Sequence, residues 1–347
     1  EEALTVEEVL VGILCYNHED YVAQCLDSVL RQKCDFPFKI YVFDDVSTDR
    51  SWSIIQEYKE KYGERMIVEQ PEHNTYSAGN RNAFLQFFEK VNRAEYVAFC
   101  EADDYWTDDC KLQKQYDAMQ QNQDAALCIH DVELTDVSNV HCMGIVPGRM
   151  DAAWSQKELI TRILTYHVSF RMNSYFIRSA ALEDADMYAD FWDYWAVDLS
   201  LLIYAALKGR MLYVSDNMAV KRVNNAGSLS HQANLEKNIC RQQIAMFEGD
   251  IRWIGLFDRL TGGAYEDLVR YYKRFREIKL YYLYQGKLEQ NKNVSNGNGR
   301  MYQREFGRKI NRMYIRLGRK LCKDDECRFV RLSGKWMEKE WKRLQKR

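Results

Sequence analysis

The feature that most constrains the fold is an alternation of short β-rich runs with amphipathic stretches over the first 130 residues. Runs rich in β-branched and aromatic residues predict strands, whereas apolar residues that recur every three to four positions predict helices. This alternation is typical of a largely parallel sheet flanked by helices. We expect strands at 9–15, 39–43, 66–69, 96–100 and 125–129, with helices at 21–31, 51–62, 78–91 and 111–122.

The pattern is less regular in the remainder of the chain. Between residues 155 and 230 it predicts a helix at 156–165, a strand at 174–177, a helix at 195–208 capped by Gly209, and two short strands around 211–223. After residue 231 it predicts long, charge-rich helices. They are interrupted at Gly262-Gly263 and by an Asn- and Gly-rich stretch at 291–299.

Charge is distributed unevenly along the chain. The net charge is −2, but residues 231–347 hold 28 Lys and Arg against 14 Asp and Glu, a net +14, and residues 1–230 hold 21 against 37, a net −16. Segregation of this size indicates two units with different partners. We therefore expect an acidic catalytic domain at 1–231 and a basic α-helical extension at 232–347.

Several classes of protein are disfavoured by composition. No apolar run approaches the roughly 20 residues of a membrane span, and the acidic start lacks the basic region of a signal peptide. The ten cysteines are scattered and have no zinc-ligand spacing. We expect reduced thiols and a cytoplasmic protein.

Polar residues follow three of the predicted strands. Tyr16-Asn17-His18-Glu19 comes after the first, Asp44-Asp45-Val46-Ser47-Thr48-Asp49 after the second, and Glu101-Ala102-Asp103-Asp104 after the fourth. In open α/β sheets ligands bind outside the carboxyl ends of the strands, so we expect one polar crevice. Crowded carboxylates are tolerated where a cation neutralises them, which indicates a divalent metal holding a phosphorylated ligand.

These motifs, in this order, resemble family 2 glycosyltransferases with the GT-A fold, an inverting type that uses nucleotide-diphosphate sugars. The resemblance covers about residues 8–231. The segments that carry it are Cys15–Gln32, Asp44–Asp49, Asn74 with Gly79–Asn82, Glu101–Trp106 and Lys111–Gln115. It implies a Rossmann-like domain, with a mostly parallel sheet flanked by helices.

The resemblance implies that the nucleotide sugar is bound by the polar loops. Asp44 or Asp45 would hydrogen-bond the base, beside Tyr16, Asn17 and Glu19. A carboxylate and an aromatic ring suit uracil, whose N3 carries a donor. Alternatively, Asp44 serves only to cap the next helix.

The acidic motif and one arginine would hold the rest of the donor. The resemblance implies that Glu101 contacts the ribose and that Asp103 binds Mn²⁺ or Mg²⁺, with Asp104 supporting it or sharing the metal and Ala102 between Glu101 and Asp103. Arg81 would reach a phosphate oxygen. Alternatively, Glu101–Asp104 is only a solvated acidic turn, and Arg81 is only a surface arginine.

Inversion needs a general base opposite the leaving diphosphate. The stretch Tyr194–Leu201 resembles the family helix that supplies it, which implies Asp198, with Asp193 as second candidate. Alternatively, Asp198 is only an acid in the first turn of a helix, where the helix dipole favours a negative charge.

The segment Ala219–His231 resembles the end of the family's catalytic domain, with two departures. Lys221 stands where the family usually has Tyr, and Asn224 where it usually has His. Since that His binds the metal in some relatives, His231 is a candidate substitute, although a lone His is more often structural.

The reaction implied by the resemblance is transfer of a hexosyl or N-acetylhexosaminyl group from a UDP-sugar. The acceptor would be a saccharide or lipid-linked saccharide in bacterial surface-polysaccharide assembly. Basic and aromatic residues at 271–284 suit peripheral contact with the inner face of the cell membrane, or else a helix-packing core. No nucleic-acid partner is expected, and an oligomer is compatible with the sequence.

Two other classes remain open. A nucleotidyltransferase also joins a nucleotide crevice to an acidic metal site, but it would usually carry a Gly-rich loop where this chain has Tyr16–Glu19. A membrane- or polyanion-binding adaptor would bind through its basic tail and be indifferent to loss of Asp103.

Overall fold

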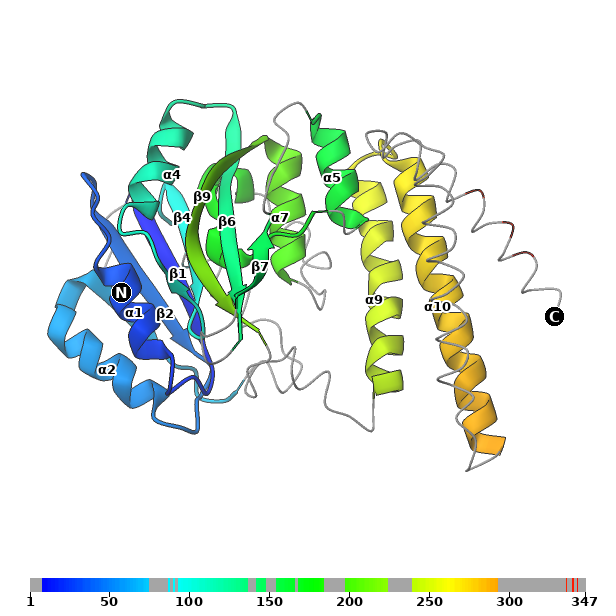
Figure 1. The fold of residues 1–347 in the computed structure, drawn as a ribbon, viewed down its shortest axis with the longest axis horizontal. Helices are drawn as coiled ribbons and strands as arrows, with labels where there is room; N and C mark the ends of the chain where they lie inside the picture. Colours follow the sequence, from blue (N-terminus) through cyan, green and yellow to red (C-terminus); the bar gives the residue numbers. More distant parts are fainter. Residues whose placement is uncertain are drawn as a thin grey trace. The chain divides into compact units, whose positions relative to one another are not determined.

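The computed structural model in Figure 1 describes residues 8–74, 93–136, 142–147, 154–165, 168–183, 197–223 and 239–292, with a few single positions such as Phe87. The chain divides into two compact units, each of which is described by itself. The first contains residues 1–156, 168–192 and 196–232, and the second contains 157–167, 193–195 and 233–347. The two short segments of the second unit interrupt the range that the charge pattern assigned to one domain.

Nine strands of the described residues form one sheet in the first unit. They are β1 (Val9–Cys15), β2 (Phe38–Asp44), β3 (Met66–Glu69), β4 (Tyr96–Glu101), β5 (Tyr105–Trp106), β6 (Ala125–Thr135), β7 (Cys142–Val146), β8 (Phe176–Arg178) and β9 (Arg210–Arg222). Their order is β3-β2-β1-β4-β8-β6-β9-β5, and β7 pairs with β6.

The sheet is mixed. The strands β3, β2, β1 and β4 are parallel neighbours, as β6 and β9 are. Antiparallel pairs join β8 to β4 and β6, β7 to β6, and β5 to β9. The expected α/β class is confirmed, with the parallel half at the N-terminal side, where the polar loops follow their strands.

In the described part of the first unit, four helices accompany this sheet, with three short 3-10 turns. They are α1 (Val22–Leu30), α2 (Ser51–Tyr62), α4 (Lys111–Gln120) and α7 (Val197–Lys208), with η1 (Gly63–Arg65), η2 (Met172–Ser174) and η3 (Ser179–Leu182). The helical spacing of α1 places four fully buried side chains on one side, Val22, Cys25, Leu26 and Val29. Alternate residues of β1 share their core cluster, namely Val9, Val11, Ile13 and Cys15.

Element positions follow the sequence closely in the parallel half. The strands β1 and β3 and the helix α2 have the expected bounds, and α1, β2, β4 and α4 differ by one or two residues at an end. The helix expected at 78–91 lies outside the described residues, apart from Phe87 and Lys90. The Phe87 ring contacts Tyr41, Phe43 and Phe99, so it covers the sheet there.

The expectation of two short strands around 211–223 was wrong, because β9 is one strand of 13 residues. The polar run Ser215-Asp216-Asn217, which resembles a turn, is exposed and forms an irregularity within the strand. There Val214 pairs with His130 and Asn217 with Asp131, so two residues are left over. The irregularity lets β9 continue along β6 to the acidic motif.

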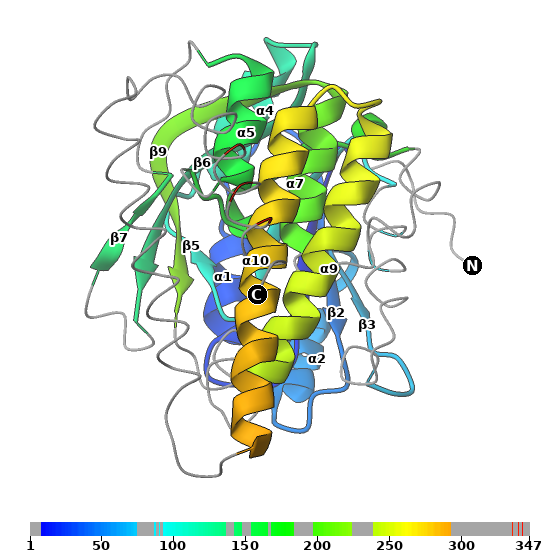
Figure 2. The ribbon, with the colours of Figure 1, turned by 90° about the vertical axis from the view of Figure 1, so that its right-hand side faces the viewer.

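The second unit contains most of α5 (Gln156–Leu164), together with α9 (Ile239–Leu260) and α10 (Glu266–Lys292). Figure 2 shows α9 and α10 side by side, joined by a turn in which Gly262 and Gly263 have positive φ. Tyr271 and Tyr272 are buried, as expected for a helix-packing core. The Nε of Arg276 lies 2.8 Å from Oδ2 of Asp250, and both side chains are buried.

No helix in the described part of the chain combines the length and apolarity that crossing a bilayer requires. The cysteines in that part are free thiols, and most of them are buried. Membrane contact through α10 stays a prediction.

Candidate active site

The acidic motif begins at the last residue of β4 and turns sharply. The Asp104 N–H donates to the Glu101 carbonyl at 2.9 Å, and the Ala102 N–H donates to the carbonyl of Leu14 at 3.0 Å. The second bond ties the turn to the end of β1. Ala102 itself is fully buried, so its backbone N–H anchors the turn to β1.

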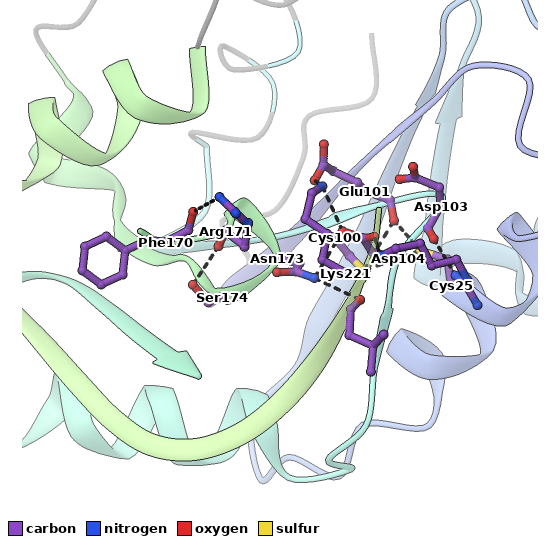
Figure 3. A network of polar contacts seen from close by, with 12 residues as sticks. Cys25, Cys100, Glu101, Asp103, Asp104, Phe170, Arg171, Asn173, Ser174 and Lys221 are labelled. Atoms are coloured by element: carbon purple, nitrogen blue, oxygen red, sulfur yellow. Dashed lines mark hydrogen bonds and ion pairs between the residues drawn. The ribbon is translucent and has the colours of Figure 1, made fainter. Parts of the chain in front are cut away.

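Asp104 is the buried anchor of this motif (Figure 3). Its Oδ1 accepts the backbone N–H of Arg222 at 2.9 Å, and its Oδ2 accepts the Asn173 amide at 3.2 Å. Burial raises its pKa, against the opposing effect of Lys221. These contacts join the motif to β9 and η2, so Asn173 supports the acidic motif.

Lys221 bridges two of the three carboxylates. Its Nζ lies 2.5 Å from Oε2 of Glu101 and 3.4 Å from Oδ2 of Asp104. Burial works against the ammonium form, but the charges of Asp104, Glu101 and Asp103 outweigh it and raise the pKa of Lys221 well above 10.5. Lys221 therefore carries a lasting positive charge within the motif.

Asp103 lies between the motif and the loop after β1. Its Oδ2 is 3.9 Å from Nε2 of His18. Its carbonyl accepts a hydrogen bond from the Arg222 guanidinium, which also lies over the rings of Tyr21 and Tyr105, at 4.8 and 4.7 Å. Arg222 thus contacts the backbone of Asp103, and His18 lies beside its carboxylate.

Asp44 has a structural task in the second polar loop. It is fully buried, and its carboxylate accepts hydrogen bonds from the Ser47 backbone at 2.8 Å, the Ser47 hydroxyl at 2.5 Å and the Gln70 amide at 2.8 Å. The first N–H of α2, that of Ser51, donates to Oδ1 of Asp49 at 2.9 Å, so Asp49 and not Asp44 contacts the start of this helix. A contact between Asp44 and a base stays a prediction.

The loop after β1 is joined to that turn by hydrogen bonds. Asn17 adopts a positive φ of 56°, and its Oδ1 accepts the Thr48 N–H at 2.7 Å. The Glu19 carboxylate accepts the Arg50 N–H at 3.0 Å. Asn17 and Glu19 therefore shape the loop, and any contact they make with a nucleotide is a prediction.

Asp45 and Tyr16 remain the candidates for the base. The Asp45 N–H donates to the Cys15 carbonyl at 2.9 Å, and the Asp45 carbonyl accepts the Asn74 amide at 2.6 Å. These bonds place Asp45 where the ends of β1 and β2 meet. Tyr16 is half-buried in the adjoining loop.

Asp198 lies in the first turn of α7 with an exposed side chain. Its pKa is nevertheless raised from the ordinary 3.8, first because surrounding protein desolvates the carboxylate and then because of the charge of Glu101. The Leu199 backbone, Lys221 and Arg171 oppose this shift. Asp198 therefore lies within electrostatic reach of Glu101, although its side chain is exposed.

The electrostatics of Tyr175 also indicate that Asp198 and Glu101 act on one region of the first unit. It is almost completely buried, and burial raises its pKa, followed by the charge of Asp198 and, more weakly, of Glu101. Its position after η2 therefore brings one ring within electrostatic reach of both carboxylates.

Some predicted residues are not among those described. Arg81, His231, Asn224 and Asp193 lie outside the described residues, and their roles stay predictions. Sequence reasoning missed His18 and Arg222 as supports of Asp103. For His18 the signal was present, since it stands in the polar loop after the first strand.

The residues present fit a divalent ion that is only partly held by protein. Among the described residues, no group of three or more His, Cys, Asp and Glu side chains is arranged to hold a metal. Mg²⁺ and Mn²⁺ prefer oxygen ligands, and Mg²⁺ is usually held by one or two carboxylates, with phosphates and waters completing the shell. Asp103 suits that arrangement.

The chain resembles several known proteins in sequence. It is 34% identical to the uncharacterized protein Rv1520 of Mycobacterium tuberculosis over 125 residues, 35% of this chain and 34% of that protein. It is 29% identical over 181 residues to the Staphylococcus aureus poly(ribitol-phosphate) beta-N-acetylglucosaminyltransferase TarS, 50% of this chain and 28% of TarS. The chain thus spans about a third or less of the length of these relatives.

A solved structure shares the fold. Staphylococcus aureus TarS 1–349 in complex with UDP aligns with a TM-score of 0.52 and 19% identity, covering 84% of this chain and 93% of that one. In addition, the sequence model of glycosyl transferase family 2 matches residues 10–184, half of the chain, including both polar loops and the acidic motif. By this match the chain belongs to glycosyl transferase family 2.

Proposed function

We propose that this protein transfers a sugar from a UDP-sugar to a saccharide or lipid-linked saccharide acceptor and inverts the anomeric configuration. The observation that carries the proposal is the position of Asp198, which lies within electrostatic reach of Glu101 in the same unit. An exposed carboxylate within electrostatic reach of the acidic motif suits a base that acts on an acceptor near the bound donor.

The donor would lie across the ends of β1, β2 and β4. Asp45 is the better candidate for the uracil edge, because hydrogen bonds within the turn already engage the carboxylate of Asp44. Tyr16 would lie beside the base and Glu101 would contact the ribose. The shared fold with TarS, which was solved with UDP, supports uridine as the nucleoside.

Asp103 would hold Mg²⁺ or Mn²⁺ together with the diphosphate. The ion would offset the negative charge that develops on the leaving group. His18 and Arg222 keep Asp103 in place for this task, and Asp104 fixes the turn from beneath.

Asp198 would act as the general base. It takes the proton of the acceptor hydroxyl while that oxygen bonds to C1 and the bond from C1 to the phosphate oxygen breaks. A raised pKa makes the carboxylate a stronger base than an ordinary Asp. Its exposure leaves room for an acceptor to approach.

The biological setting is proposed from the relatives and from charge. The name of TarS describes transfer to poly(ribitol-phosphate), an anionic polymer. The net +14 of residues 231–347 would attract an anionic acceptor or the inner face of the cell membrane. We infer hexosyl or N-acetylhexosaminyl transfer in the assembly of a cell-surface polysaccharide by a cytoplasmic, peripherally bound enzyme.

Calorimetric titration with UDP in Mn²⁺, Mg²⁺ or EDTA tests the donor site. We expect EDTA and Asp103→Asn each to weaken binding at least about tenfold, since each removes the ion's link between protein and diphosphate. Asp109→Asn, which alters a partly exposed acid that is paired with Arg31 and lies outside the acidic motif, is the control and should bind normally. Absence of binding under every condition would overturn the uridine assignment.

A further inference from the structure

We propose that Lys221 is a positioning residue that sets the charge of the donor site: by contacting Glu101 and Asp104 with one ammonium group, it keeps both carboxylates from the metal and adds a positive charge for the diphosphate. This inference rests on the proposed function. It concerns a residue at which the chain departs from the family pattern.

The backbone around Lys221 is held firmly. On β9, Val220 pairs with Tyr105 of the strand that follows the acidic motif, and the next N–H, that of Arg222, donates to Asp104. The side chain of Lys221 can therefore reach the motif without a flexible loop. It forms an ion pair with Glu101 (Figure 3). The two side chains are 23% and 34% exposed, so a ligand can reach this pair.

The charges explain why such a lysine is useful. Glu101, Asp103 and Asp104 stand within four positions of the chain, and without a counter-charge they would repel a diphosphate as well as one another. The ammonium of Lys221 contacts Glu101 and Asp104, whereas Asp103 faces His18. Asp103 is thus the carboxylate for the metal, whereas Lys221 neutralises Glu101 and Asp104.

This arrangement predicts opposite effects on two ligands. Removing the ammonium leaves more negative charge, which should strengthen binding of a cation and weaken binding of an anion. Loss of a merely structural contact would instead weaken both. The two affinities together therefore distinguish a charge-setting lysine from a packing residue.

The test measures Mn²⁺ binding without nucleotide, and UDP binding at saturating Mn²⁺, for Lys221→Met, Lys221→Gln and Lys221→Arg. For the two neutral variants we expect about tenfold tighter Mn²⁺ and about tenfold weaker UDP. Lys221→Arg keeps the charge and should stay near the unaltered protein in both. Two neutral variants guard against one that fails to fold, which circular dichroism would reveal.

The matched control is Lys114→Met. Lys114 also bridges two carboxylates, at 2.7 Å from Asp108 and 2.5 Å from Asp216, but it takes no part in the acidic motif. This variant should leave both affinities unchanged. Neutral variants at Lys221 that leave both affinities unchanged, or weaken both, would overturn the inference while leaving the donor site intact. Failure of the unaltered protein to bind UDP would overturn the proposed function as well.

Discussion

The Nε2 atom of His18 lies 3.9 Å from Oδ2 of Asp103, so the loop after β1 meets the acidic motif after β4. The His18 backbone N–H donates to the Ser51 hydroxyl at 2.8 Å, which fixes this loop against the start of α2. The imidazole is therefore held beside the carboxylate to which we assign the metal.

Replacing His18 with Ala should weaken Mn²⁺-dependent UDP binding by about tenfold, because side chains that orient a metal ligand commonly contribute that much. Calorimetry measures the loss, and the midpoint of thermal unfolding should change little. UDP affinity equal to that of the unaltered protein would show that His18 does not support Asp103.

The raised pKa of Asp198 predicts the pH dependence of turnover. A general base works only when deprotonated, so kcat/KM should fall on the acid side at a higher pH than for an ordinary Asp. Since the charge of Lys221 lowers the pKa of Asp198, Lys221→Met should move this limb to still higher pH. Profiles of UDP release from a UDP-sugar test both shifts, and an acid limb that Lys221→Met leaves in place would contradict this assignment.

Gly209 follows α7 for a steric reason. A Cβ there would lie 2.8 Å from the Asp124 carbonyl and 2.9 Å from the Ala126 Cβ. Gly209→Ala should therefore destabilise the first unit by about 1–3 kcal/mol in urea unfolding. Gly255→Ala is the matched control in α9, where a Cβ meets nothing within 4 Å, and should be neutral or stabilising. Equal effects of the two substitutions would argue against this close approach.

The buried pair of Arg276 and Asp250 should dominate the stability of the α9–α10 pair. Leaving one charge buried alone costs about 3–5 kcal/mol, so Arg276→Met and Asp250→Asn should each destabilise strongly. The double variant should lose less than the sum of the two, because neither charge is then left alone. Chemical unfolding of all four proteins measures this coupling, and strict additivity would exclude it.

Much of the parallel half could be predicted from sequence. The continuous apolar run Val9–Cys15 predicts a buried strand, and the helical spacing of buried residues predicts α1, so both elements could be located from the sequence. The polar loops after β1, β2 and β4 also converge as expected, because parallel neighbours end at one edge.

Other features depended on contacts between distant residues. Lys221 reaches Glu101 across 120 positions, and Asn173 reaches Asp104 across 69, so neither contact has a local signal. The run at Ser215–Asn217 resembles a turn, but pairing with β6 carries β9 through it. Tertiary pairing overrode local preference there.

The most direct test of the account compares UDP-sugar turnover with UDP binding in Asp198→Asn. Asparagine keeps the shape of the side chain but cannot accept the proton. The account predicts that UDP binding at saturating Mn²⁺ stays within about twofold, while UDP release from a UDP-sugar that the unaltered protein turns over falls by at least about a hundredfold. Turnover close to that of the unaltered protein would contradict Asp198 as the base, and with it the mechanism proposed for this site.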